Sequence, residues 1–177
     1  ASFFFFFEQA IQQVSNGADL SDYFIVELAN DESVSVFPLL GNIIYDQGAP
    51  FNNLCPMING RRAVTGCVAT AMAQIMRYYS YPKNGTGTVT YTGSNGAATL
   101  NLADYDFDWS LILNDYTKSY ISAQGEAVAK LMLACGASIN MNYSADGSGS
   151  HLNKAMKALK DNFGYSKDIE YYDSTGD

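Results

Sequence analysis

The sequence predicts an α+β domain. Three segments, residues 67–79, 123–135 and 152–163, place apolar side chains at the spacing of one helical face. Two others, residues 22–37 and 85–91, contain the β-branched and aromatic residues typical of strands. The chain has 177 residues, of which 47% are hydrophobic and 16% charged. This is enough to fill a core and suits one domain, or one domain with a short appendage.

The chain opens with five consecutive phenylalanines, Phe3–Phe7, in a predicted helix over residues 1–14 that Gly17 closes. The run resembles the apolar part of a signal peptide. However, no basic segment precedes it and no small-residue cleavage site follows it. Five Phe side chains cannot all face water, so we expect them to pack on this chain or on a partner. The strand-like stretch that follows breaks at Pro38.

The most strongly predicted helix follows a loop. Frequent Gly, Pro and Asn residues make residues 38–66 mostly loop. The next segment, 67–79, is rich in alanine, and we expect Thr65 to cap it and Pro82 to end it. Its expected buried face consists of Val68, Met72, Ile75, Met76 and Tyr79.

Two further helices are predicted in the second half of the chain. Gly136 is expected to close the helix over residues 123–135. Ser150 is expected to cap the helix over residues 152–163, and Gly164 to end it. The polar, Gly/Ser-rich loop over residues 146–150 precedes this last helix.

Composition excludes several classes of function. Ten Lys and Arg against eighteen Asp and Glu give a net charge of −8, which argues against nucleic-acid binding. No uninterrupted apolar stretch approaches the roughly 20 residues of a membrane span. With one His, three Cys and no CxxC pair, we expect no structural metal and no cofactor. The Tyr-rich, Gly-rich acidic composition favours a secreted protein.

Cys67 is the strongest candidate for chemistry, because it falls in the first turn of a predicted helix. Free amides and the helix dipole there stabilise a thiolate and so favour a nucleophile. The alternative is a small buried apolar residue. Gly66 would let an extended substrate backbone approach closely. The amide of Gln47, in the preceding loop, could donate to an oxyanion together with the Cys67 N–H, although an isolated loop glutamine is usually just solvated.

The other two cysteines are interpreted as structural. Cys55 precedes Pro56 in the loop, and Cys135 falls on an apolar helical face. A disulfide between them remains open at this point.

Several runs resemble the streptopain family of cysteine peptidases, with interpain-like members the most similar. They are Gln47–Asn52, Cys55–Pro56, Thr65–Tyr79 and Tyr81–Pro82, with Gly85 and Gly87. The resemblance extends from about residue 36 to about residue 172, and the TGCVATAMAQIM run is long and specific.

The resemblance implies a papain-like fold, here its N-terminal, mainly helical half plus the tail of a propeptide. Residues 1–36 would be the end of an inhibitory propeptide, and residues 37–177 the N-terminal part of the catalytic domain. It also implies a secreted zymogen, cleaved near residues 34–37. Cys67 would be the nucleophile and Gln47 the oxyanion donor.

Substrate contacts are expected from Gly66, by the reasoning above, and from Ser148 and Gly149, which match the family's pocket-lining segment. The expected partners are protein or peptide substrates and the chain's own propeptide.

One departure from the family is serious. Its general base is a histidine in a Gly-His-Ala-Phe-like strand, followed by a Trp-rich segment, and neither occurs here. His151, the one histidine, is a candidate substitute base, a pocket-lining residue or an ordinary surface histidine. We therefore expect little activity from this chain alone, with the C-terminal half, as a separate chain, a candidate partner. The alternative is an inactive peptidase-like fragment acting as a binding or inhibitory module.

Overall fold

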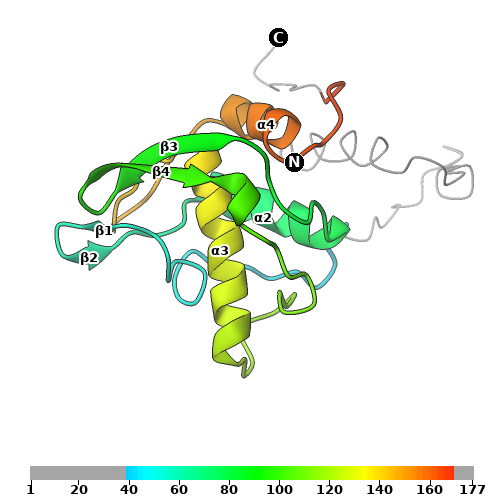
Figure 1. Ribbon diagram of the computed structural model, residues 1–177. Coiled ribbons are helices and arrows are strands. Elements are labelled where there is room, and N and C mark those ends of the chain that lie inside the picture. The colour runs from blue at the N-terminus through cyan, green and yellow to red at the C-terminus, as the bar shows by residue number, and fades with distance from the viewer. Residues whose placement is uncertain (1–38, 170–177) are drawn as a thin grey trace, which may run out of the picture.

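The computed structural model describes residues 39–169 (Figure 1). The helix predicted over residues 1–14, the strand-like stretch 22–37 and the propeptide boundary at residue 36 lie outside these residues. In chain order the elements are β1 (Met57–Ile58), β2 (Arg61–Arg62), α2 (Cys67–Tyr79), β3 (Thr88–Gly93), β4 (Gly96–Asn101), the 3₁₀ helix η2 (Leu102–Asp104), α3 (Ser122–Ser138) and α4 (Leu152–Asp161).

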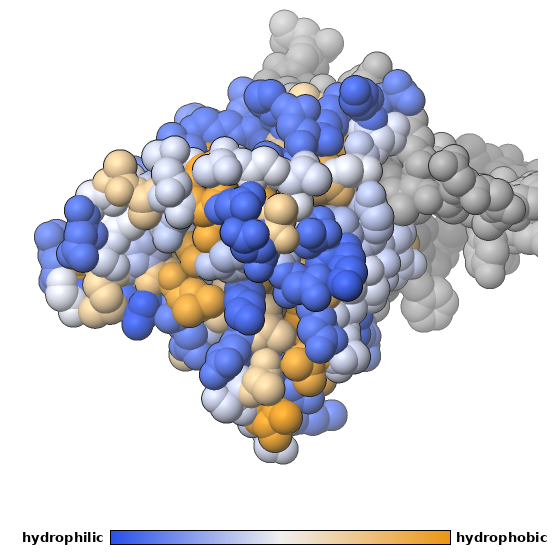
Figure 2. All heavy atoms as spheres, viewed as in Figure 1, coloured by the Kyte–Doolittle hydropathy of each residue, from blue (hydrophilic) through white to orange (hydrophobic). Residues whose placement is uncertain are grey.

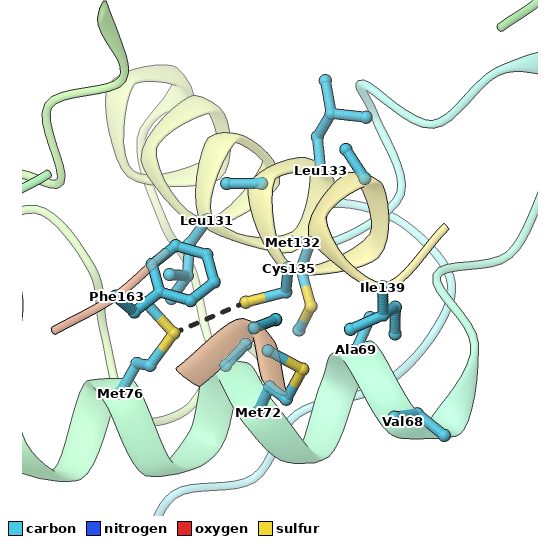
Figure 3. Close-up of a cluster of buried hydrophobic side chains, with 14 of the residues drawn as sticks. Val68, Ala69, Met72, Met76, Leu131, Met132, Leu133, Cys135, Ile139 and Phe163 are labelled. Atoms are coloured by element: carbon cyan, nitrogen blue, oxygen red, sulfur yellow. Dashed lines mark hydrogen bonds between the residues drawn. The ribbon is translucent and has the colours of Figure 1, made fainter. Parts of the chain in front are cut away.

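Helices α2 and α3 pack against each other and form the centre of the core. The face predicted for α2 is confirmed for Val68, Met72, Ile75 and Met76, which are buried, whereas Tyr79 is only half-buried. Met72 and Met76 point toward Met132 and Cys135 of α3 (Figure 3), and the Met76 and Cys135 sulfurs are 3.6 Å apart. Helix α3 is buried on most of its circumference from Ala127 to Ala137, which is the pattern of a central helix.

Two antiparallel hairpins and α4 complete the fold. β1 pairs with β2, and β3 pairs with β4 in a separate two-stranded sheet with Val89 opposite Leu100. Val89 and Tyr91 alternate with exposed threonines along β3, as the sequence predicted, and β3 lies against α3. α4 contacts both α2 and α3, and Phe163 just beyond it is fully buried.

Four predicted helix ends are wrong, one of them the end of α4, which stops at Asp161 rather than at Phe163. The N-cap of α2 is Gly66 rather than Thr65, and no side chain caps it. Gly136 lies inside α3, which continues to Ser138, and its missing side chain makes room for the Tyr143 hydroxyl. The N-cap of α4 is His151, whereas the Ser150 hydroxyl donates to the Ile139 carbonyl (2.8 Å).

Cys55 and Cys135 do not form a disulfide. All three cysteines are free thiols, and Cys55 and Cys135 are 1% and 0% exposed. Both therefore act as small apolar residues of the core, as the sequence suggested.

The surface of the described residues is mostly polar, with apolar patches. Figure 2 shows one such patch at the end of the molecule where α3 begins. The exposed large apolar residues are Ile44, Leu54, Met57, Tyr78, Tyr120 and Ile121. Between residues 39 and 169, no helix combines the length and apolar character needed to cross a bilayer.

Candidate active site

Cys67 is the first residue of α2 and its side chain is exposed to solvent. The first amides of a helix have no partner within the helix, and no side chain caps this one. The thiol therefore lies at a solvent-accessible helix N-terminus, where free N–H groups and the helix dipole favour negative charge. This is the environment the sequence predicted for a nucleophilic cysteine.

Gly66 occupies a backbone conformation that requires glycine. Its φ of 85° and ψ of 140° are essentially closed to residues with a side chain. A Cβ at this position would lie 2.6 Å from Met141 Cε and 3.0 Å from the Ser148 carbonyl oxygen. Met141 and Ser148 therefore fill the space that a side chain at position 66 would need. Both this packing and the positive φ require glycine here.

Gln47 is held close to Cys67 in the fold. The Thr65 N–H, two residues before Cys67, donates to the Gln47 carbonyl oxygen (3.2 Å). The segment that follows is anchored too, because the Asn52 amide donates to the Ala63 carbonyl (3.0 Å). The Gln47 side chain is half-buried, and we find no hydrogen bond from its amide within residues 39–169. The Thr65 hydrogen bond thus holds the Gln47 main chain close to the start of α2.

The loop containing Ser148 and Gly149 is attached to the segment that leads into α2. The Val64 N–H donates to the Ser144 carbonyl (3.1 Å), and the Ser148 hydroxyl donates to the Val64 carbonyl (2.6 Å). The same hydroxyl accepts from the Ser144 N–H (3.0 Å). Gly149 is exposed and exchanges two backbone hydrogen bonds with Asn142.

These hydrogen bonds determine which groups of the loop remain free to contact a ligand. The Ser148 hydroxyl already donates to and accepts from groups inside the protein, so a contact of this loop with substrate would come mainly from its main chain or from the exposed Gly149. The loop also carries an exposed ion pair between Asp146 and Arg61 (2.8 Å), which fixes it weakly to the β1–β2 hairpin.

His151 is exposed at the N-cap of α4. Its carbonyl accepts from the Lys154 N–H, and its imidazole makes no hydrogen bond to Cys67. The structure therefore brings together Cys67, Gly66, Gln47 and the Ser148–Gly149 loop, but it does not pair His151 with the thiol.

The two buried thiols differ from Cys67 in exposure. Burial raises the pKa of the Cys55 thiol to about 12, and it raises the pKa of Cys135 as well. Both remain protonated near neutral pH, and thiols react as thiolates. In the described part of the chain, no three His, Cys, Asp or Glu side chains gather as a metal site would need.

Comparison with known proteins places this arrangement in a class. A sequence profile of the Peptidase C10 family matches residues 45–176. Streptopain of Streptococcus pyogenes is 34% identical over 145 residues, which are 72% of this chain and 36% of streptopain. The thiol protease/hemagglutinin PrtT of Porphyromonas gingivalis is 34% identical over 134 residues, 73% of this chain and 15% of PrtT.

Solved structures agree. A prointerpain A fragment of Prevotella intermedia superposes with a TM-score of 0.64 at 32% identity, over 70% of this chain and 41% of that one. Active wild-type interpain A superposes with a TM-score of 0.63 at 35% identity, over 68% of this chain and 52% of that one. The fold is thus the predicted α+β, papain-like fold, covering part of the domain. The chain belongs to the Peptidase C10 family, the streptopain-type cysteine peptidases. It spans well under half the length of the curated relatives it matches.

Sequence reasoning missed the residues that support the site. The sequence predicts Thr65 as a helix cap and indicates no role for Thr70, Ser144 or Met141. Met141 (by its side chain) and Ser144 (by its main chain) meet the Cys67 segment through tertiary contacts, for which periodicity carries no signal. Thr65 and Thr70 bond locally, to each other and to Gly66, but the partner of a hydroxyl is not encoded in helical periodicity. The run TGCVAT did single out Thr65 and Thr70 as part of a specific motif.

Proposed function

We propose that this chain is the N-terminal part of a secreted cysteine endopeptidase that cleaves peptide bonds through an acyl-enzyme. Cys67 is the nucleophile, and the Gln47 amide with the Cys67 N–H stabilises the oxyanion. The observation that carries the proposal is an exposed thiol at the uncapped N-terminus of α2, with Gln47 fixed beside it through Thr65. Membership of a cysteine peptidase family supports it.

The proposed chemistry proceeds in two steps. The Cys67 sulfur attacks the substrate carbonyl carbon, and the carbonyl oxygen takes up negative charge within reach of the two N–H donors. The amine leaves with a proton, and water then hydrolyses the thioester. Gly66, Ser148 and Gly149 are proposed to line the path of the substrate backbone, with Ser148 contributing its main chain because its hydroxyl is occupied.

The proton acceptor is proposed to be a histidine outside residues 1–177. The one histidine of the sequence, His151, is exposed and makes no hydrogen bond to the thiol. We therefore propose that this chain alone hydrolyses peptides slowly or not at all, and that the missing group comes from the rest of the catalytic domain, in the same polypeptide or as a second chain. Residues 1–36 are proposed to be the end of a propeptide, to which the similarity to a prointerpain fragment lends support.

The proposal is tested by alkylating the chain with a peptidyl fluoromethyl ketone and locating the adduct by mass spectrometry. We expect modification at Cys67 alone, because Cys55 and Cys135 are 1% and 0% exposed. The reagent should also outpace iodoacetamide, since its peptide part occupies the substrate path. Cys67→Ser should abolish the adduct, and Cys135→Ser should leave it unchanged.

Equal labelling of all three cysteines, or none at Cys67, would contradict the peptidase proposal. If the chain alone hydrolysed a fluorogenic peptide, Cys67 would keep its proposed role. Only the proposal that the proton acceptor lies outside residues 1–177 would be refuted.

A further inference from the structure

Two buried threonine hydroxyls next to Cys67 form a short hydrogen-bonded chain. Thr70 Oγ1 donates to the Gly66 carbonyl oxygen (3.0 Å), and Thr65 Oγ1 lies 2.8 Å from Thr70 Oγ1. Because Thr70 has one hydroxyl proton and directs it to Gly66, Thr65 is the donor of the second bond. The two residues are 1% and 7% exposed, so water does not compete for these bonds.

This chain fixes the orientation of one peptide group. The Gly66 carbonyl accepts both the Thr70 hydroxyl and the Thr70 N–H (3.0 Å). The Gly66 carbonyl and the Cys67 N–H belong to the same planar peptide and point in opposite directions. Holding the carbonyl therefore sets the direction in which the Cys67 N–H points.

Thr65 also holds the other proposed oxyanion donor. Its N–H donates to the Gln47 carbonyl oxygen (3.2 Å), while its hydroxyl reaches the Cys67 peptide through Thr70. A threonine before a helix ordinarily caps it, but here the cap position is Gly66, and the Thr65 hydroxyl is turned inward. One residue thus connects Gln47 to the Gly66–Cys67 peptide.

We propose that Thr65 and Thr70 are positioning residues for the reaction at Cys67, and that their hydroxyls aim the Cys67 N–H at the oxyanion. The inference rests on the proposed peptidase function. Both side chains are buried, so they act through the Gly66–Cys67 peptide and not by contact with the substrate.

The test compares two reactions of the same thiol in the full 177-residue chain. A peptidyl aldehyde adds reversibly to Cys67: an S–C bond forms, the C=O π bond breaks, and the thiol proton ends on the oxygen, which occupies the oxyanion position. Iodoacetamide alkylates the sulfur with loss of iodide and forms no oxyanion. The aldehyde affinity therefore reports the N–H donors, whereas the alkylation rate reports only the sulfur.

Thr65→Val and Thr70→Val remove each hydroxyl and keep the side-chain shape. We expect each to weaken aldehyde binding by about tenfold, less than the roughly 100-fold or more for deleting a donor outright. Thr65→Ser and Thr70→Ser keep the hydroxyl and should bind within about twofold of the unchanged chain. The matched control is Ser138→Ala, which removes a hydroxyl bond to the Cys135 carbonyl (2.8 Å) near the end of α3 and should change neither reaction.

Iodoacetamide rates at Cys67 should be the same in all these variants. Valine variants that bind the aldehyde as tightly as the unchanged chain would overturn the proposal. A parallel loss of alkylation rate would overturn it too, because the sulfur itself would have moved.

Two further measurements cover the cases in which the variants do not fold or the unchanged chain does not bind the aldehyde. If the valine variants do not fold, NMR of the unchanged chain decides, since a slowly exchanging Thr70 hydroxyl proton supports the proposal and a rapidly exchanging one refutes it. If the unchanged chain shows no aldehyde binding beyond that of Cys67→Ser, the peptidase proposal fails and this one with it. Binding that is strong but insensitive to the hydroxyls refutes only the positioning role.

Discussion

Replacing Gly66 by alanine should be among the most damaging single-atom additions to the described structure. The first cost is conformational, because φ of 85° with ψ of 140° lies in a region that residues with a Cβ rarely adopt. Such a conformation costs about 1–3 kcal/mol for a non-glycine residue.

The second cost is steric. The new Cβ would lie 2.6 Å from Met141 Cε, 2.8 Å from Met141 Sδ and 3.0 Å from the Ser148 carbonyl oxygen. Met141 is 1% exposed, so its thioether has little room to retreat, and the Ser148 carbonyl is main chain. Overpacking of this kind costs about 1–3 kcal/mol. Together the two costs predict that Gly66→Ala lowers the free energy of unfolding by about 2–6 kcal/mol.

Urea unfolding followed by circular dichroism measures this loss, and a second glycine separates its two parts. Gly60 has a φ of 76°, and a Cβ there would meet nothing within 4 Å. Gly60→Ala should therefore show only the conformational cost, about 1–3 kcal/mol. If Gly66→Ala destabilises no more than Gly60→Ala, the packing of Met141 and Ser148 against the Cys67 segment is not as described.

Two further predictions concern the core. Gly136→Ala should destabilise the chain by about 1–3 kcal/mol, although alanine ordinarily favours a helix interior, because its Cβ would overlap the buried Tyr143 hydroxyl. That hydroxyl has no hydrogen-bond partner among the described residues, so adding Tyr143→Phe should recover most of the loss in urea unfolding, and no recovery would argue against the overlap. Stability should also fall as the pH rises from 9 toward 12, because burial raises the pKa of the Cys55 thiol from 9.0 to about 12 and the unfolded chain loses this proton first. Urea titrations across this range should show a shallower decline for Cys55→Ala, and a flat profile for the unchanged chain would contradict the reasoning.

The helices could be predicted from the sequence because their buried residues recur at helical spacing along the chain. Val68, Met72, Ile75 and Met76 recur at helical spacing and are all buried in α2. Strand β4 was not predicted, because its sequence GAATLN buries only Leu100 and does not alternate strongly. It is a strand because it pairs with β3, a non-local cause that a local pattern does not contain.

The mistaken helix ends have the same origin. Gly136 has the residue type of a helix stop, but a glycine also permits a close approach, and here Tyr143 makes that approach inside α3. Ser150 has the residue type of a cap, yet its hydroxyl bonds to Ile139 across the fold. At both positions the residue type favours a helix end locally, but in the structure the residue makes a tertiary contact instead.

The candidate site shows where sequence reasoning reaches its limit. Chemistry alone makes Cys67 and Gln47 candidates, because a helix-start thiol and an amide donor make sense together, and the resemblance to streptopain-type peptidases is what assigns their roles. For Gly66 the sequence predicts close approach of a substrate backbone, and the structure adds a second reason for glycine, since Met141 and Ser148 fill the space that a Cβ would need. Because glycine is the N-cap, α2 has no side-chain cap, and the Thr65 hydroxyl bonds to Thr70 instead. The hydroxyls proposed to orient the Cys67 peptide bond to each other and to Gly66, all within six residues, but residue types alone do not tell which partner a hydroxyl takes.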